Sequence, residues 1–192
     1  MRIKKESLLP GLRLIQASAS HGGETSKGKR KTYRPLDPKQ ALHVVLRSSK
    51  ARGELSLLHP KHRQFIHSFI HQIAEKRGIK IYQFSNVGNH LHLLIRVSSR
   101  RIWQQFLREI SGGIAMMVTG ARKGSAFGEK NSPRTFWDHL AFTRIVRFGR
   151  DFENVAEYLI QNLFEGSGVP LKKLWAMGEG ANDRFNHRLR PT

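Results

Sequence analysis

The chain has 192 residues, the length of one ordinary domain with tails, and its 34 Lys and Arg against 14 Asp and Glu give a formal net charge of +20. Hydrophobic residues make up 39% of it, enough for a folded core, and the absence of Cys excludes a disulfide scaffold, a zinc finger and thiol catalysis. No apolar run approaches the roughly 20 residues of a membrane span. We therefore expect a soluble, cytoplasmic domain with no membrane partner, whose first candidate partner is nucleic acid. A basic surface that serves only solubility is the alternative.

The first 35 residues are predicted to form a flexible basic arm. Residues 18–26 are small and polar, and a run of Lys and Arg follows them. Pro35 and Pro38 then mark the start of the folded domain. We expect an arm at 1–35, one domain at 36–165 and a C-terminal tail at 166–192. The basic residues of the arm that we expect to contact phosphates are Lys27, Lys29, Arg30, Lys31 and Arg34.

The first half of the domain predicts a strand, a helix and a hairpin. Residues 42–47 are apolar and β-branched, which favours a strand. Pro60 suits the start of a helix and Gly78 its end, with apolar residues at helical spacing between them. Residues 79–86 and 90–97 predict two further strands joined by a short turn that contains glycine.

A second helix is predicted after this hairpin. Ser99 is a suitable N-cap, and an apolar stripe runs from residue 102 to residue 110. The Ser111-Gly112-Gly113 sequence interrupts the stripe, so we expect the helix to kink or stop there. Residues 120–135 are rich in Gly, Lys, Arg and Ser and predict an exposed loop.

The end of the domain completes an α+β pattern. Residues 136–148 predict one or two strands, and Asp151 is expected to cap a last helix that runs through Phe164. The order of elements indicates an antiparallel sheet with helices mainly on one face, in the split β-α-β (ferredoxin-like) arrangement.

Two histidines stand out on the third predicted strand. Side chains two apart on a strand share a face, so His90 and His92 project together, while Leu91 and Leu93 point into the core. The imidazoles are then close enough to share one cation, and His43 is placed similarly on its own strand. A chain with ten His also places some at this spacing by chance, so a structural pair is the alternative interpretation.

The last predicted helix carries a tyrosine and an asparagine on one face. Tyr158 and Asn162 are four residues apart, beside the apolar stripe. A tyrosine hydroxyl attacks phosphodiesters when a metal ion polarises the phosphate, and an amide oxygen is a hard ligand suited to Mg²⁺ or Mn²⁺. A packing tyrosine at the edge of the core is the alternative.

These motifs together resemble a known family. The sequence Asn89-His90-Leu91-His92-Leu93, with the Tyr158-Leu159-Ile160-Gln161-Asn162 helix, resembles the HUH single-strand DNA transposases, which include the REP-associated tyrosine transposases. The likeness extends over residues 33–165. It implies an antiparallel sheet with the histidine strand at its centre and the tyrosine on a helix that crosses one face.

The resemblance implies a function and a set of site residues. Tyr158 would be the nucleophile that forms a 5′-phosphotyrosine with single-stranded or hairpin DNA, and His90, His92 and Asn162 would hold Mg²⁺ or Mn²⁺. Family members occur as monomers or homodimers. A domesticated relative that binds a DNA or RNA hairpin without cutting it is the alternative. The other predicted phosphate contacts are Arg100, Arg101, Arg122, Lys123, Arg144, Arg147 and Arg150.

Overall fold

A single antiparallel sheet organises the computed structural model, which describes residues 20–24, 33–121 and 135–167. The strands run in the spatial order β1-β5-β2-β4-β3. They are β1 (Ser20–His21), β2 (Ala41–Arg47), β3 (Lys80–Asn86), β4 (His90–Arg96) and β5 (Phe142–Val146). The helices are α2 (Pro60–Lys76), α3 (Arg100–Thr119) and α4 (Arg150–Ser167), with a short 3-10 turn, η2 (Gly53–Leu55), before α2.

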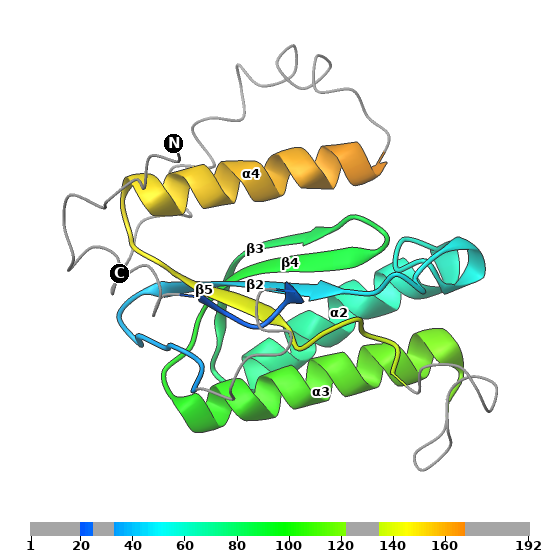
Figure 1. Cartoon of the computed structure of the whole chain (residues 1–192), viewed down its shortest axis with the longest axis horizontal. Helices are drawn as coiled ribbons and strands as arrows, with labels where there is room; N and C mark the ends of the chain where they lie inside the picture. The colour runs from blue at the N-terminus through cyan, green and yellow to red at the C-terminus, as the bar shows by residue number, and fades with distance from the viewer. Residues whose placement is uncertain (1–19, 25–32, 122–134, 168–192) are drawn as a thin grey trace, which may run out of the picture.

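The helices form unequal layers on the two faces of the sheet. Helices α2 and α3 cover one face, and α4 alone crosses the other (Figure 1). Strand β4 lies between β2 and β3, and β2 lies between β4 and β5, so each helical crossover skips one strand. This is the split β-α-β arrangement, and the predicted α+β fold class is confirmed. Strand β4 is therefore paired along both edges, and its five central residues are buried.

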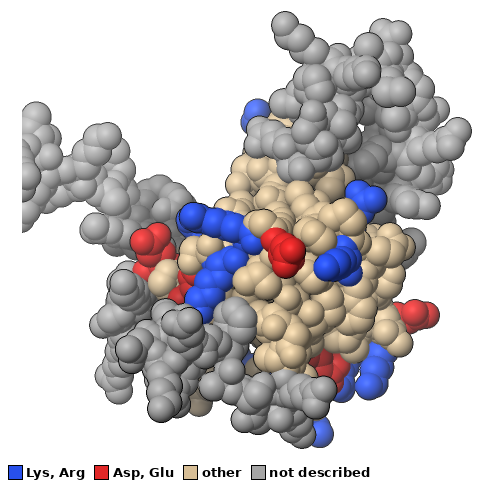
Figure 2. Space-filling model, turned by 90° about the vertical axis from the view of Figure 1, so that its right-hand side faces the viewer, with Lys and Arg blue, Asp and Glu red and all other residues tan. Residues whose placement is uncertain are grey.

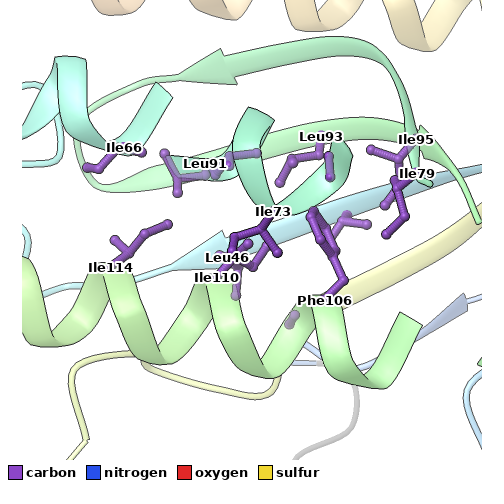
Figure 3. Close-up of a cluster of buried hydrophobic side chains, with 14 of the residues drawn as sticks. Leu46, Ile66, Ile73, Ile79, Leu91, Leu93, Ile95, Phe106, Ile110 and Ile114 are labelled. Atoms are coloured by element: carbon purple, nitrogen blue, oxygen red, sulfur yellow. The ribbon is translucent and has the colours of Figure 1, made fainter. Parts of the chain in front are cut away.

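Alternation along β2 and β4 separates the core from the opposite face. The side chains that face α2 and α3 are aliphatic and buried (Figure 3): Leu42, Val44, Leu46, Leu91, Leu93 and Ile95. Together with α2 and α3 they build the larger hydrophobic cluster. Ala41 and Leu94 point the other way and pack with Phe152 and Leu159 of α4 in a smaller cluster. The period of two thus leaves the histidine positions on the α4 side.

Helix α3 does not stop at its glycines, so that expectation was wrong. It runs unbroken from Arg100 to Thr119, with the Ser99 side chain accepting a hydrogen bond from the Ile102 N–H as predicted. A Cβ atom at Gly113 would lie 2.5 Å from Cζ of Phe69 on α2. The glycine therefore allows the two helices to pack closely, and tertiary contact outweighs the low helix propensity of the sequence.

The ends of the domain also differ from the sequence-based expectation. Strand β1 lies inside the predicted basic arm and pairs with β5, placing Ser20 opposite Arg144. Between residues 136 and 148 only Phe142–Val146 is a strand. Helix α4 begins at Arg150, so Asp151 lies in its first turn rather than at its cap. The Asp151 carboxylate accepts a hydrogen bond from the Arg147 N–H and pairs with Arg144.

None of the helices in the described ranges is long and apolar enough to cross a lipid bilayer. The predicted loop 120–135 falls mostly outside those ranges. The predicted tail 166–192 overlaps the end of α4, which runs to Ser167 and so past the expected end at Phe164, and lies outside the described ranges from residue 168 onward.

Candidate active site

His90 and His92 lie side by side on the α4 face of β4. Their ring centroids are 4.7 Å apart and their planes are inclined at 66°. His92 is 4% exposed, whereas His90, at the start of the strand, is half-buried. The two side chains therefore share a face of the strand, as their spacing predicted. One imidazole of the pair is buried and the other is accessible.

The His92 ring has one nitrogen engaged and one without a partner. Its Nδ1 lies 3.2 Å from Nε2 of His43, and the two ring planes are nearly parallel. Its Nε2 is buried and has no hydrogen-bond partner within the described residues. Burial, followed by the neighbouring His43 and His90, lowers the pKa of His92 to about 3. Burial and then Arg144 lower the pKa of His43 to about 4. Both imidazoles are therefore neutral at pH 7.

In His90, too, one ring nitrogen makes a hydrogen bond. Its Nδ1 lies 2.5 Å from Oδ1 of Asn89. An amide oxygen only accepts, so Nδ1 carries the proton and Nε2 keeps a lone pair. Partial burial lowers the pKa of His90, and the Arg47 guanidinium, directly across the sheet, adds to the shift. A neutral imidazole with a free Nε2 is the form that binds metal ions.

Helix α4 brings the predicted tyrosine to the histidines. The Tyr158 ring stands edge-on to the His92 ring, with centroids 5.8 Å apart, and the side chain is 47% exposed. Asn162 follows one helical turn later and is half-buried, and its Nδ2 has no hydrogen-bond partner within the described part of the chain. Tyr158 is thus accessible to a substrate, and Asn162 lies on the same helix with a buried Nδ2 that makes no hydrogen bond within the described residues.

The donor set fits a hard divalent cation bound partly by the substrate. Across the described residues, no three His, Cys, Asp or Glu side chains are arranged so that they could hold a metal ion together. The two histidines therefore need an amide or phosphate oxygen to complete a site. The buried Nε2 of His92, which has no partner among the described residues, and the amide side chain of Asn162 are compatible with this.

Three residues near the histidines were not among the predicted site residues. His43 contacts His92, Arg47 lies opposite His90, and Ser85 of β3 lies directly opposite His92. The Ser85 hydroxyl is buried and has no hydrogen-bond partner among the described residues. The alternation of side chains along β2 places His43 and Arg47 on one face, so the sequence pattern could have indicated both residues. Ser85 could be found only from the pairing register of β3 with β4.

Two hollows adjoin the site. One, of about 300 Å³, is lined by Val45 and Arg47, by Phe142 and by residues 23–24. The other, of about 550 Å³, runs along β3 between α2 and α4. None of the described residues that line it is acidic. The basic side chains and histidines of this lining are Arg63, His67, His71 and Lys80. The first hollow also contains the acidic residues Glu24 and Asp138, so only the basic lining of the second is suited to the phosphates of a nucleic acid.

The predicted phosphate contacts have different environments. Arg101, Arg147 and Arg150 are exposed. Arg34 donates to the Ala141 carbonyl and Arg144 pairs with Asp151, so both guanidinium groups are held within the fold. Arg100 is exposed, donates to the Arg34 carbonyl and lies over the Tyr33 ring. The remaining candidates lie outside the described residues: Lys27, Lys29, Arg30, Lys31, Arg122 and Lys123.

Basic and acidic groups are interspersed on the face at the β3–β4 hairpin end of the sheet (Figure 2). The visible blue side chains do not merge into one continuous band there. On this face, the large positive charge of the chain is not gathered into a single described patch.

Comparison with known proteins places the chain in a family. Residues 38–162, well over half of the chain, match the model of the family described as transposase, IS200-like. The chain belongs to the IS200-like transposase family. The resemblance that the histidine and tyrosine motifs indicated is thereby confirmed, and both motifs lie within the matched residues. A comparison with curated proteins finds none that matches.

A comparison with solved structures gives two matches of low sequence identity. One is a REP-associated tyrosine transposase bound to a REP hairpin, 12% identical, with a TM-score of 0.48 over 69% of this chain and 72% of that chain. Another is a candidate transposase from Deinococcus radiodurans R1, 13% identical, with a TM-score of 0.41 over 70% of this chain and 98% of that chain.

Proposed function

We propose that this IS200-like transposase family member is a metal-dependent DNA transesterase whose nucleophile is Tyr158. One observation carries the proposal. The accessible Tyr158 on α4 packs against His92, whose buried Nε2 has no partner among the described residues. A nucleophile and a pair of neutral imidazoles converge from two elements that are about 60 residues apart in sequence, at an open face of a strongly basic chain.

The reaction exchanges one phosphodiester for another. The Tyr158 oxygen attacks the phosphorus of single-stranded DNA, a phosphotyrosine bond forms, and the bond between phosphorus and the 3′ oxygen breaks. The phenol releases a proton to solvent, which reaches the half-exposed side chain, and the departing 3′ oxygen takes one up. The 5′ phosphate stays on the protein. Attack by a 3′ hydroxyl restores a phosphodiester, so rejoining needs no ATP.

Metal ligation is assigned to three side chains. His90 and His92 would contribute their Nε2 atoms and Asn162 its amide oxygen to one Mg²⁺ or Mn²⁺ ion, which neutralises and orients the phosphate when bound. The chain itself holds both imidazoles neutral, because burial lowers their pKa values. It also fixes His90 through Asn89.

The expected substrate is a DNA hairpin with single-stranded flanks. A net charge of +20 and family membership support a DNA partner. Exposed arginines at the ends of α3 and α4, Arg101 and Arg150 among them, are available to the phosphates. These contacts would position the strand and leave sequence recognition to contacts with the bases.

Covalent trapping tests the proposal. The protein is incubated with Mn²⁺ and a pool of hairpins with randomised single-stranded flanks, labelled at the 3′ end because the 5′-phosphorylated fragment stays on the tyrosine. We expect a labelled adduct on a denaturing gel, lost in Tyr158→Phe and kept in Tyr33→Phe, since Tyr33 is the other exposed tyrosine of the described residues. An adduct that persists in Tyr158→Phe assigns the chemistry elsewhere. Hairpin binding with no adduct from any hairpin supports the non-catalytic alternative.

A further inference from the structure

His43 is a buried histidine on the α4 face of the inner strand β2. It lies on β2 between Leu94 of β4 and Arg144 of β5, and the planes of its ring and the His92 ring are nearly parallel, 12° apart, with a centroid distance of 5.4 Å. The ring of Phe142 also contacts the His43 ring, edge to face. A polar ring that is 8% exposed here needs a hydrogen-bonding reason.

The 3.2 Å contact between His43 Nε2 and His92 Nδ1 has two possible proton arrangements. If His43 donates, His92 carries its own proton on Nε2, and a buried N–H is left without an acceptor in the described part of the chain. If His92 donates from Nδ1, its Nε2 has a lone pair directed away from His43. Only in the second arrangement can the buried Nε2 of His92 serve as a metal ligand.

We propose that His43 is a positioning residue, whose Nε2 accepts the Nδ1–H of His92 and so fixes the tautomer and ring plane that present the Nε2 lone pair of His92 to a divalent cation. This inference rests on the proposed function. Metal-binding histidines generally donate their other ring N–H to a fixed acceptor. In this chain Asn89 serves His90 in that way, and His43 serves His92.

His43 is not a third metal ligand in this arrangement. Its Nε2 is occupied by the Nδ1 side of His92, and the two nitrogens of an imidazole point in divergent directions. Likewise, His43, His90 and His92 are not arranged as a three-histidine metal site, and no other three His, Cys, Asp or Glu side chains of the described residues form one. The role of His43 therefore acts through His92, not through contact with the cation or the phosphate.

The His92 tautomer provides a direct test that needs neither metal nor DNA. In the full-length, metal-free protein at pH 7.5, ¹⁵N-detected correlation spectra of the histidine rings distinguish Nδ1–H from Nε2–H. We expect His92 to be the Nδ1–H form in the wild type and to lose that preference in His43→Phe. In His43→Gln, a side-chain oxygen can replace Nε2 of His43 as acceptor, so the Nδ1–H form should be retained.

Binding of Mn²⁺ alone, followed by electron paramagnetic resonance, gives the second readout. We expect affinity to fall roughly 10- to 100-fold in His43→Phe, the range for loss of such a partner, and only a few-fold in His43→Gln. His62→Phe is the matched control, because His62 is also buried but bonds to the Glu54 carbonyl on the other face of the sheet. It should leave the His92 tautomer and Mn²⁺ affinity unchanged.

Two results would overturn the proposal. One is a wild-type His92 with its proton on Nε2, which needs no variant and is independent of whether the variants fold. The other is a folded His43→Phe with wild-type Mn²⁺ affinity. Failure of the proposed function is a separate result, because it is seen as the absence of any covalent adduct from the wild type, whatever the His92 tautomer.

Discussion

The Tyr158 ring meets the His92 ring edge-on, with the planes at 85°. Because the contact is between rings, Tyr158→Phe keeps it and removes only the hydroxyl. We expect this variant to unfold in urea within about 0.5 kcal/mol of the wild type, whereas Tyr158→Ala loses the ring contact and about 1 kcal/mol. Equal destabilisation of the two variants would show that the hydroxyl has a structural role.

We expect His90→Ala to separate cleavage from binding. His90 is a half-buried side chain at the start of β4, and most affinity should come from phosphate contacts elsewhere on the basic surface. Cleavage of a labelled hairpin should fall by at least 100-fold, while the gel-shift affinity of the same preparation changes only a few-fold. A parallel loss of both activities would indicate that the pair is structural.

Two truncations should have different effects at the N-terminus. Removal of residues 1–19 leaves β1 in place, so cleavage at saturating DNA should persist. Removal of residues 1–24 also deletes β1, the hydrogen bond from Gly23 N–H to the Leu140 carbonyl and one wall of the hollow beside Val45. We expect this second truncation to lower both stability and cleavage. Residues 20–24 contain no Lys or Arg, so the additional loss cannot come from lost positive charge.

Metal-free protein should lose stability in mild acid. The unfolded chain protonates its histidines as the pH falls through about 6.5, whereas folded His43 and His92 stay neutral to about 4 and 3. The unfolded state then binds more protons, so the free energy of unfolding falls between pH 6.5 and 4 and is fully restored above 6.5. The slope is about 1.4 kcal/mol per pH unit for each such group.

Urea unfolding in EDTA across this range measures the slope. His43→Gln should reduce it, because one of the two buried imidazoles is gone. His139→Ala, which removes an exposed imidazole, should leave it unchanged. A wild-type protein whose stability is constant from pH 7 to 4.5 would contradict the prediction.

Neighbouring glycines in α3 should respond in opposite ways to alanine. A Cβ at Gly112 would meet nothing within 4 Å, so Gly112→Ala should stabilise the protein by about 1 kcal/mol through helix propensity. A Cβ at Gly113 would lie 2.5 Å from the Phe69 ring, which must then move. We expect Gly113→Ala to be at least 1 kcal/mol less stable than Gly112→Ala in thermal or urea unfolding. Equal gains would show that Phe69 yields at no cost.

Local patterns were sufficient to predict most of the fold. The alternation in β2 and β4 and the Ser99 cap depend on residues close in sequence, and each is confirmed. The α4 face of His90 and His92 follows from the same period of two. Tyr158 reaches His92 because the helix crosses that face, which only the family resemblance implied beforehand.

Features that depend on distant partners could not be predicted. Strand β1 is two residues long and has no apolar pattern, and its pairing partner lies more than 100 residues away, at Thr143 and Arg144. The continuity of α3 depends on Phe69, which belongs to another helix. The contact between His43 and His92 required the register of β2 on β4. In each case the deciding atom is supplied by an element far away along the chain.

Because α4 alone covers one face of the sheet, the candidate site can come apart while the rest of the domain stays folded. Helix α4 is anchored by a small cluster, chiefly Phe152, Val155, Ala156 and Leu159. Detaching it exposes far less apolar surface than opening the cluster beneath α2 and α3, so it costs less free energy. We therefore expect α4, which carries the proposed nucleophile Tyr158, to detach before the sheet unfolds. If the proposed function holds, a preparation with a normal melting curve can still lack activity, and adduct yield is the stricter measure of its quality.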